Sequence, residues 1–350
     1  MFQIQKITLL LFAVLLSFSF SACAGDNAGC AENGIQSGIY TTHFDGLERT
    51  YRVHVPAGLK KGQAAPLLLL FHGWSGDEND YLDEPLVREE ADRRGYILLA
   101  PRGIGSEAPD GRNNSWTFRG SASGLDAEGA DTCNDDLTRD YVYPSCLDAG
   151  IAKNGCSWTH CQGKGADDVD FTLALIDKVS GKLCVDAQRV YAAGSSNGGM
   201  FTWELAQNAK SASHFRAIAP NIGLPHRGYL DTAPGDAAIP VLLTTGTLDK
   251  TVPPGAWEDS HFTTTTDGDH FYYTSATAIT RAWASSLGCS TKEAAAAVET
   301  GLENVDCRSY CNTDPGLTRV LDCRAEMGHD SGYSWTWGLT LDFFDQHAER

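Results

Sequence analysis

The sequence predicts an α/β protein with a doubly wound, mostly parallel sheet, helices on both faces and a disulfide-rich insertion. Continuous apolar runs at 65–71 and 95–100 are typical of strands covered on both faces. Residues 168–179 carry apolar side chains at helical spacing and lead into a further apolar strand. A chain of 350 residues is accounted for by one such domain, which we place at residues 25–350.

The elements follow in alternation along the chain. Residues 49–56 alternate apolar and polar side chains after an Asp45-Gly46 turn, which indicates a half-exposed edge strand. Further strands are predicted at 65–71, 95–100, 189–193, 215–219, 240–245 and 318–323. Helices are predicted at 168–179, 276–287 and 337–347. Buried parallel strands require helices on both faces of the sheet.

Residues 1–24 have the pattern of a signal peptide, with Lys6 ahead of an apolar run from 7 to 20 that ends in small residues. The run is too short for a membrane span. Ala22-Cys23-Ala24 fits ordinary secretion, whereas Phe20 to Cys23 resembles a lipoprotein box with a lipidated Cys23. We therefore expect an exported protein, either secreted to the extracellular space or periplasm, or anchored through Cys23.

Eleven cysteines in an exported chain predict disulfides, about five once Cys23 is set aside. Most of the cysteines form two clusters. The first cluster is Cys133, Cys146, Cys156 and Cys161, and the second is Cys289, Cys307, Cys311 and Cys323. Cys30 and Cys184 lie outside both clusters. Pairing within each cluster is compatible with the even counts, but the spacing does not fix it. Cys156, His160 and Cys161 also fit a zinc pattern, and in an oxidising compartment we favour the disulfide.

Residues 104–165 are rich in Gly, Asp and Cys, and they lack periodicity. We interpret them as an insertion that overhangs the functional site.

The net charge of −18 argues against nucleic acid or an anionic membrane as a partner. We expect a monomer without a membrane span.

A short strand runs into Gly194-Ser195-Ser196-Asn197-Gly198 and then into a helical pattern. The G-x-S-x-G spacing is that of a nucleophile elbow, in which a serine occupies a sharp strand-to-helix turn. Ser196 is therefore the candidate nucleophile. The alternative is an ordinary Gly/Ser turn.

A serine nucleophile needs a histidine to take its proton and a carboxylate to orient that histidine. Asp249 follows the 240–245 strand and His329 follows the last strand, so the chain order is Ser, acid, His. The alternatives are a turn aspartate and a surface-loop histidine. The oxyanion hole is assigned to the backbone N–H groups of Asn197 and Trp74, and His72 is given no proton-transfer role.

These residues carry a resemblance. From about Tyr51 onward the chain resembles the esterase family that includes extracellular polyhydroxybutyrate depolymerases and the feruloyl and acetylxylan esterases of carbohydrate esterase family 1. The matching features are Leu70-Phe71-His72-Gly73, Asp167-Asp168-Val169, Val185 to Tyr191, Gly194 to Met200, Gly246 to Asp249 with Val252-Pro253, and Gly328-His329. The resemblance implies an α/β-hydrolase fold, a Ser196, Asp249 and His329 triad, and ester hydrolysis without a cofactor or metal. Ser331 stands where relatives often carry a tryptophan, and this departure bears on the substrate.

The leading hypothesis is an exported serine carboxylesterase, feruloyl esterase-like on plant polymer esters. The alternatives are a polyhydroxybutyrate depolymerase, an acetylxylan esterase, another serine hydrolase such as a peptidase or thioesterase, and a non-catalytic polymer-binding scaffold. A scaffold predicts a damaged triad, and all three residues are present. Trp74, Tyr333 and Trp335 are the candidate substrate-binding residues, with Trp116 and Trp158 as further aromatic candidates from the insertion.

Overall fold

The protein is seen in a computed structural model that describes residues 34–60, 62–104, 114–118, 128–129, 168–229, 239–258, 261–266, 271–292, 295–314 and 317–348. The predictions for residues 1–24, for Cys23 and Cys30, for Cys133 to Cys161, and for most of the 104–165 insertion, Trp158 included, lie outside these residues.

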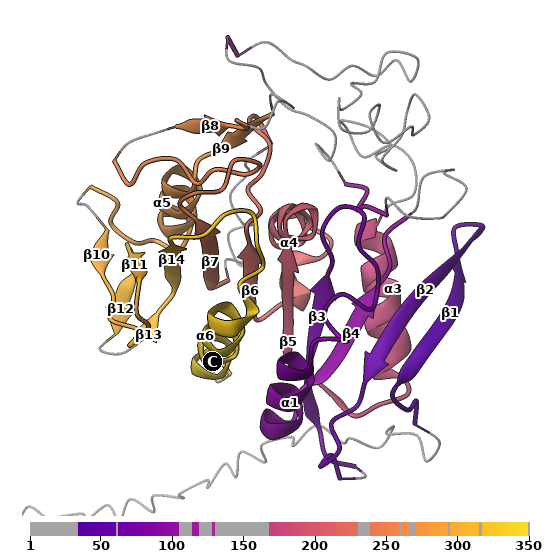
Figure 1. Ribbon diagram of the computed structural model, residues 1–350. Helices are drawn as coiled ribbons and strands as arrows, with labels where there is room; N and C mark the ends of the chain where they lie inside the picture. The colour runs from indigo at the N-terminus through magenta and orange to yellow at the C-terminus, as the bar shows by residue number, and fades with distance from the viewer. Residues whose placement is uncertain are drawn as a thin grey trace, which may run out of the picture.

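A ten-stranded sheet forms the centre of the structure (Figure 1). Its strands, in spatial order, are β1 (Gly38–Phe44), β2 (Leu47–His54), β4 (Ile97–Pro101), β3 (Ala65–Phe71), β5 (Val185–Ser195), β6 (Ala217–Asn221), β7 (Val241–Gly246), β14 (Val320–Ala325), β11 (Val305–Ser309) and β10 (Ala296–Ala297). The pairs from β4 to β14 are parallel, and both edges of the sheet are antiparallel. Two small two-stranded sheets lie apart: β8 (Phe262–Thr264) with β9 (Tyr272–Thr274), and β12 (Asn312–Asp314) with β13 (Leu317–Thr318).

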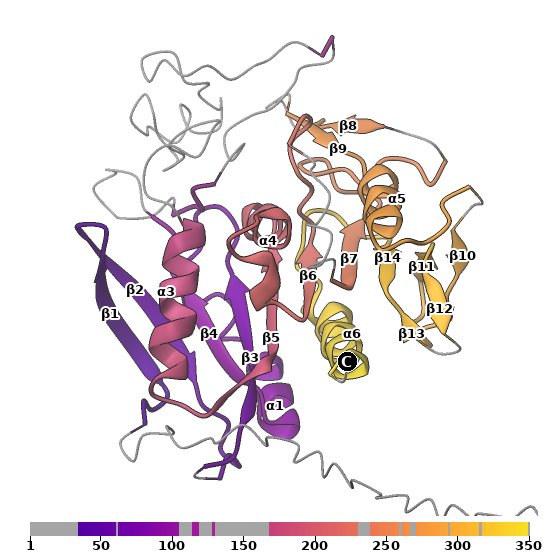
Figure 2. The ribbon, with the colours of Figure 1, turned by 180° about the vertical axis from the view of Figure 1, so that it is seen from behind.

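Helices cover both faces of the sheet, as predicted. The elements α3 (Asp168–Ser180), α4 (Asn197–Gln207) and α5 (Ala276–Ser286) lie on one face, and α1 (Pro85–Arg94) and α6 (Tyr333–Gln346) on the other (Figures 1 and 2). A 3₁₀ turn, η1 (Ala212–His214), follows α4.

Strand β3 shows how the apolar run builds two cores. All seven of its residues are buried, and successive side chains point to opposite faces. Leu67 and Leu69 join the core that contains Phe201 of α4, whereas Leu68 and Leu70 join the core that contains Val87 of α1. The continuous apolar run therefore reflects two-sided burial.

Some boundaries and one helix differ from the predictions. Strand β6 begins at Ala217, because Phe215 caps η1. Helix α6 begins at Tyr333, four residues before its apolar stripe, because Thr336 donates its N–H to the Gly332 carbonyl. Helix α1 was not predicted, since its only buried residues are Val87 and Ala91 and its apolar face is narrow.

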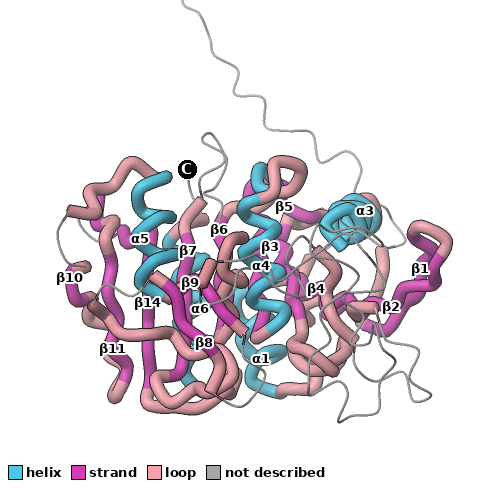
Figure 3. The backbone as a smooth tube through the Cα atoms, turned by 90° about the horizontal axis from the view of Figure 1, so that it is seen from above, coloured by secondary structure: helices cyan, strands magenta, loops and turns pink. Residues whose placement is uncertain are grey.

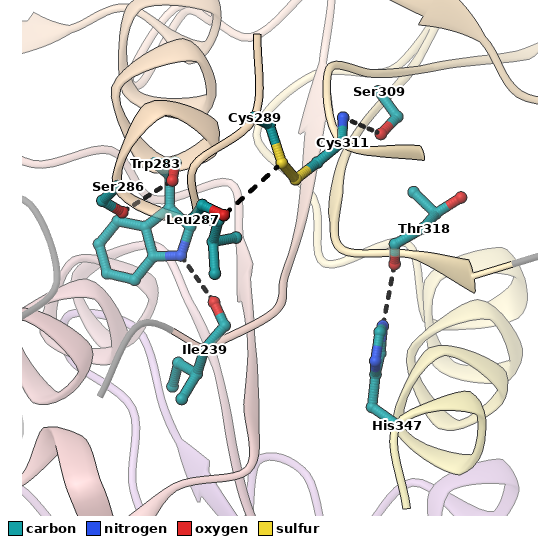
Figure 4. The surroundings of a disulfide bond; sticks show 9 residues. All are labelled: Ile239, Trp283, Ser286, Leu287, Cys289, Ser309, Cys311, Thr318 and His347. Atoms are coloured by element: carbon teal, nitrogen blue, oxygen red, sulfur yellow. Dashed lines mark hydrogen bonds between the residues drawn. A yellow bond between two sulfur atoms is a disulfide. The ribbon is translucent and has the colours of Figure 1, made fainter. Parts of the chain in front are cut away.

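Two disulfides join members of the late cysteine cluster, Cys289–Cys311 and Cys307–Cys323. Cys184 is also disulfide-bonded. Figure 4 shows Cys289–Cys311 at the end of α5, where Trp283 donates its Nε1–H to the Ile239 carbonyl at 2.8 Å. The Cys289–Cys311 disulfide links the end of α5 to the segment after β11, and the Trp283 hydrogen bond links α5 to the segment before β7. The strands β7 and β11 are the two neighbours of β14. Over the residues described above, no helix has the length and apolar character that a membrane crossing requires.

Candidate active site

The turn from β5 into α4 carries the predicted nucleophile. Ser196 has φ 55° and ψ −120°, a backbone conformation that is costly for a residue with a side chain. A Cβ at Gly194 would lie 2.8 Å from Thr202 Oγ1, and one at Gly198 would lie 2.5 Å from the His72 carbonyl oxygen. Only glycine therefore allows α4 to pack so closely against β5 and against the end of β3.

Three segments bring the predicted nucleophile, base and acid together at one end of the sheet. Figure 3 shows the strands of the sheet from above. Ser196 follows β5, Asp249 follows β7, and His329 follows β14. The Ser196 Oγ lies 2.9 Å from His329 Nε2, and His329 Nδ1 lies 2.7 Å from Asp249 Oδ2. The carboxyl ends of the parallel strands account for this convergence.

Asp249 is held so that one oxygen faces the histidine. Its side chain is fully buried, and its Oδ1 accepts the N–H groups of Thr251 at 2.8 Å and Val252 at 2.9 Å. Its Oδ2 is left to accept the His329 Nδ1–H. That hydrogen bond leaves His329 Nε2 as the acceptor that faces the Ser196 hydroxyl.

The two residues assigned to the oxyanion hole lie beside Ser196. Asn197 is the first residue of α4, where backbone N–H groups have no partner within the helix. Trp74 lines the same cavity as Ser196. The loop that carries Trp74 lies against the Ser196 turn: a Cβ at Gly73 would lie 3.4 Å from the Ser196 Cβ.

Residues 114–118 hold this loop in place. Trp116 donates its Nε1–H to the His72 carbonyl at 2.8 Å and its backbone N–H to Asn197 Oδ1 at 2.9 Å. Its ring is completely buried and stacks on Phe201. The interpretation of Trp116 as a substrate-binding aromatic is therefore wrong: the ring is part of the core beneath the site.

A buried ion pair anchors the same segment. Arg49 Nη2 lies 2.6 Å from Asp168 Oδ1, and both side chains are almost fully buried. The other oxygen of Asp168 accepts the Thr117 N–H at 2.7 Å. Asp168, one of the residues that carry the family resemblance, thus fixes the segment that holds the Trp74 loop.

His72 lies inside the protein as a neutral side chain. Gly103 donates its N–H to His72 Nε2 at 2.8 Å, and His72 Nδ1–H donates to the Gly73 carbonyl at 2.6 Å. Burial lowers the pKa of His72 to about 4. One ring nitrogen bonds to the Trp74 loop and the other to the backbone after β4, so His72 links these two segments.

A hydroxyl network behind the nucleophile was missed by sequence reasoning. The Oγ of Ser195 shares a hydrogen bond with the Tyr81 hydroxyl at 2.8 Å and accepts one from Ser331 Oγ at 3.1 Å. Asn221 donates to the Ser331 carbonyl at 2.7 Å. The network therefore ties the loop after His329 to β5 and β6. Only the pair Ser195-Ser196 is visible in the sequence, and nothing there points to Tyr81.

A cavity of about 420 Å³ opens over Ser196 and His329. Trp74 and Tyr333 line it, as the substrate-binding prediction requires of them. Trp335 does not line it; its side chain packs against the core beneath α6. The two aromatic residues are two positions apart, which is about half a turn of α6, so they point to opposite sides of the helix: Tyr333 faces the cavity and Trp335 does not.

Comparison with known proteins shows which proteins this chain is similar to. The chain is 24% identical to feruloyl esterase D of Neurospora crassa over 221 residues, which are 61% of this chain and 60% of that protein. Its structure is similar to that of acetyl xylan esterase from Aspergillus awamori, with a TM-score of 0.56, 12% identity, and coverage of 88% of this chain and 99% of that one. No family model matches the chain. The predicted α/β-hydrolase fold and the resemblance to esterases of that fold are confirmed.

Proposed function

On this fold, we propose that the chain is an exported serine carboxylesterase that works through Ser196, His329 and Asp249. The observation that carries the proposal is the continuous pair of hydrogen bonds, 2.9 Å from Ser196 Oγ to His329 Nε2 and 2.7 Å from His329 Nδ1 to Asp249 Oδ2. A serine hydroxyl becomes an effective nucleophile when such a base takes its proton.

In the first half of the reaction, Ser196 Oγ attacks the ester carbonyl carbon while His329 Nε2 takes the hydroxyl proton. The carbonyl π electrons move to oxygen, and the N–H groups of Asn197 and Trp74 stabilise the resulting oxyanion. The protonated His329 then gives its proton to the leaving alcohol as the C–O bond breaks. An acyl-enzyme ester remains on Ser196.

In the second half, a water molecule attacks the acyl carbon and gives one proton to His329 Nε2. The tetrahedral intermediate collapses, the carboxylic acid leaves, and the proton returns to Ser196 Oγ. Asp249 stabilises the imidazolium in both halves and holds its Nδ1 proton. No redox step or cofactor enters this scheme.

For the substrate, we propose feruloyl or related aryl esters of plant polymers. Trp74 and Tyr333 line the cavity and offer ring faces for an aromatic acyl group or a sugar. The similarity to a feruloyl esterase supports the same choice. Polyhydroxybutyrate and acetylated xylan are the alternatives, because the same rings also pack against aliphatic chains.

Export is proposed from the predicted signal segment together with disulfides such as Cys289–Cys311. We also propose that residues 25–350 fold as one domain and remain monomeric.

The test is a hydrolysis screen of the wild type and Ser196→Ala on methyl ferulate, acetylated xylan and polyhydroxybutyrate. Wild type is expected to hydrolyse methyl ferulate, and Ser196→Ala to lose at least about 10³-fold in kcat/KM. An organophosphonate that labels activated serines should add its mass to Ser196 in the wild type. Clearing of polyhydroxybutyrate with negligible turnover of methyl ferulate would reverse the substrate assignment, and activity of Ser196→Ala within tenfold of wild type would remove the mechanism.

A further inference from the structure

Two carboxylates line the cavity above Ser196. Asp80 follows the loop that carries Trp74, and Asp330 follows His329 directly. Neither forms an ion pair within the described part of the chain; Asp330 Oδ1 only accepts the Gly332 N–H at 2.7 Å. Among the described residues that line this cavity, none is lysine or arginine. The space next to the reacting atoms therefore carries uncompensated negative charge.

Two arginines that contact the segment containing Asp80 do not offset this charge. Arg102 is paired with the buried Glu78 at 2.7 Å, and Arg52 is paired with Asp83 at 2.6 Å. Each of these arginines is neutralised by an acid of the segment that also contains Asp80. The net charge of −18 over the whole chain adds to the negative potential.

The two carboxylates exert an electrostatic effect on Tyr333, which lines the same cavity. Burial raises the pKa of its hydroxyl, a hydrogen bond with Ser331 lowers it, and the charges of Asp80, Glu84 and Asp330 raise it further, so both cavity carboxylates act on a group that lines the cavity. Burial likewise raises the pKa of Asp80. A carboxylate that is partly removed from water repels a second anion more strongly than an exposed one does.

We propose that Asp80 and Asp330 make the cavity selective for esters that carry no negative charge near the scissile bond, and that they repel anionic esters. The inference rests on the proposed esterase function and deepens it by naming the substrate class. Carboxylates accept hydrogen bonds from hydroxyl groups, so neutral sugar esters remain acceptable while substrates with a free carboxylate do not. Asp80 and Asp330 are assigned as specificity-determining residues.

The experiment compares diethyl succinate with monoethyl succinate, which carries one negative charge at pH 8. At 10 mM salt, where the screening length is about 30 Å, kcat/KM for the monoester is expected to be at least about tenfold lower. At 1 M salt, where that length is about 3 Å, the gap should close to within about threefold. The narrowing with salt separates a charge effect from a difference in size.

Asp80→Asn should raise the ratio of monoester to diester kcat/KM about threefold or more at 10 mM salt. Asp45→Asn, which changes an exposed aspartate in the β1–β2 turn, is the matched control and should leave the ratio unchanged. If Asp80→Asn does not fold by circular dichroism, Asp330→Asn and the salt titration of the wild type decide the question.

A ratio that does not change with salt, or that stays constant in both Asp80→Asn and Asp330→Asn, would overturn the inference while leaving the esterase proposal in place. If the wild type hydrolyses neither ester nor any of methyl ferulate, acetylated xylan and polyhydroxybutyrate, the proposed function fails and the inference fails with it.

Discussion

Gly198→Ala tests whether the close contact between α4 and the end of β3 holds the site together. A Cβ at this position would lie 2.5 Å from the His72 carbonyl oxygen and closer still to that of Phe71. Heavy atoms without a bond between them rest at about 3.5 Å, so these backbone groups must move by about 1 Å. Both carbonyls belong to the chain that leads into the Trp74 loop.

The expected cost has two parts. Overpacking of a well-filled core lowers the free energy of unfolding by about 1–3 kcal/mol. Because a shift of 1 Å in a group that stabilises the transition state costs about 10²-fold in rate, kcat on methyl ferulate should fall by that factor. Urea unfolding and steady-state kinetics measure the two effects on the same preparation.

Gly338→Ala is the matched control. Gly338 lies within α6, and a Cβ there would meet no atom within 4 Å. Alanine in a helix interior is favoured over glycine by about 1 kcal/mol, so this variant should be as stable as wild type or more so, with unchanged kinetics. If Gly198→Ala kept its free energy of unfolding within about 0.5 kcal/mol of wild type and its kcat within about threefold, the close contact would not be essential.

Further predictions concern the acid, the buried ion pair and a buried histidine. Asp249→Asn should lower kcat about 10³–10⁴-fold with little change in KM, because the amide favours the wrong His329 tautomer; a loss below tenfold would contradict this. Asp168→Ala should lower the free energy of unfolding by about 3–5 kcal/mol, since Arg49 stays buried without its partner. The exposed Asp170→Ala should cost under about 1 kcal/mol. Burial lowers the pKa of His347 to about 4, below the unfolded value of about 6.5, so its stabilising contribution is present above pH 6.5 and is lost as the pH falls towards 4. His347→Gln should therefore lose less stability between pH 7 and 4.5 than wild type does, as urea midpoints at both pH values would show.

Local patterns were the part of the structure that the sequence could predict. The apolar run of β3 and the glycines around Ser196 each act over a few residues, so their signals survive without tertiary information. Asp249 and His329 could be selected because strand ends converge at one edge of a parallel sheet. The same rule could not show which oxygen of Asp249 faces the imidazole.

Contacts between distant segments could not be predicted. The Tyr81 hydroxyl bonds to a serine 114 residues away, and Arg49 pairs with an aspartate 119 residues away. Trp116 lies between segments without periodicity, yet it is completely buried. In each case the position along the chain carries no information about the partner, because tertiary packing alone decides it.

The place of β14 in the sheet determines when the protein can first become active. This strand is the last of the large sheet to be synthesised, but it lies inside the sheet, parallel to β7 and antiparallel to β11. Until it inserts, β7 presents an open edge of the kind that pairs with other chains and promotes aggregation. His329 lies on the loop after β14, so ester hydrolysis can return during refolding only once β14 has inserted, and its return would report that step.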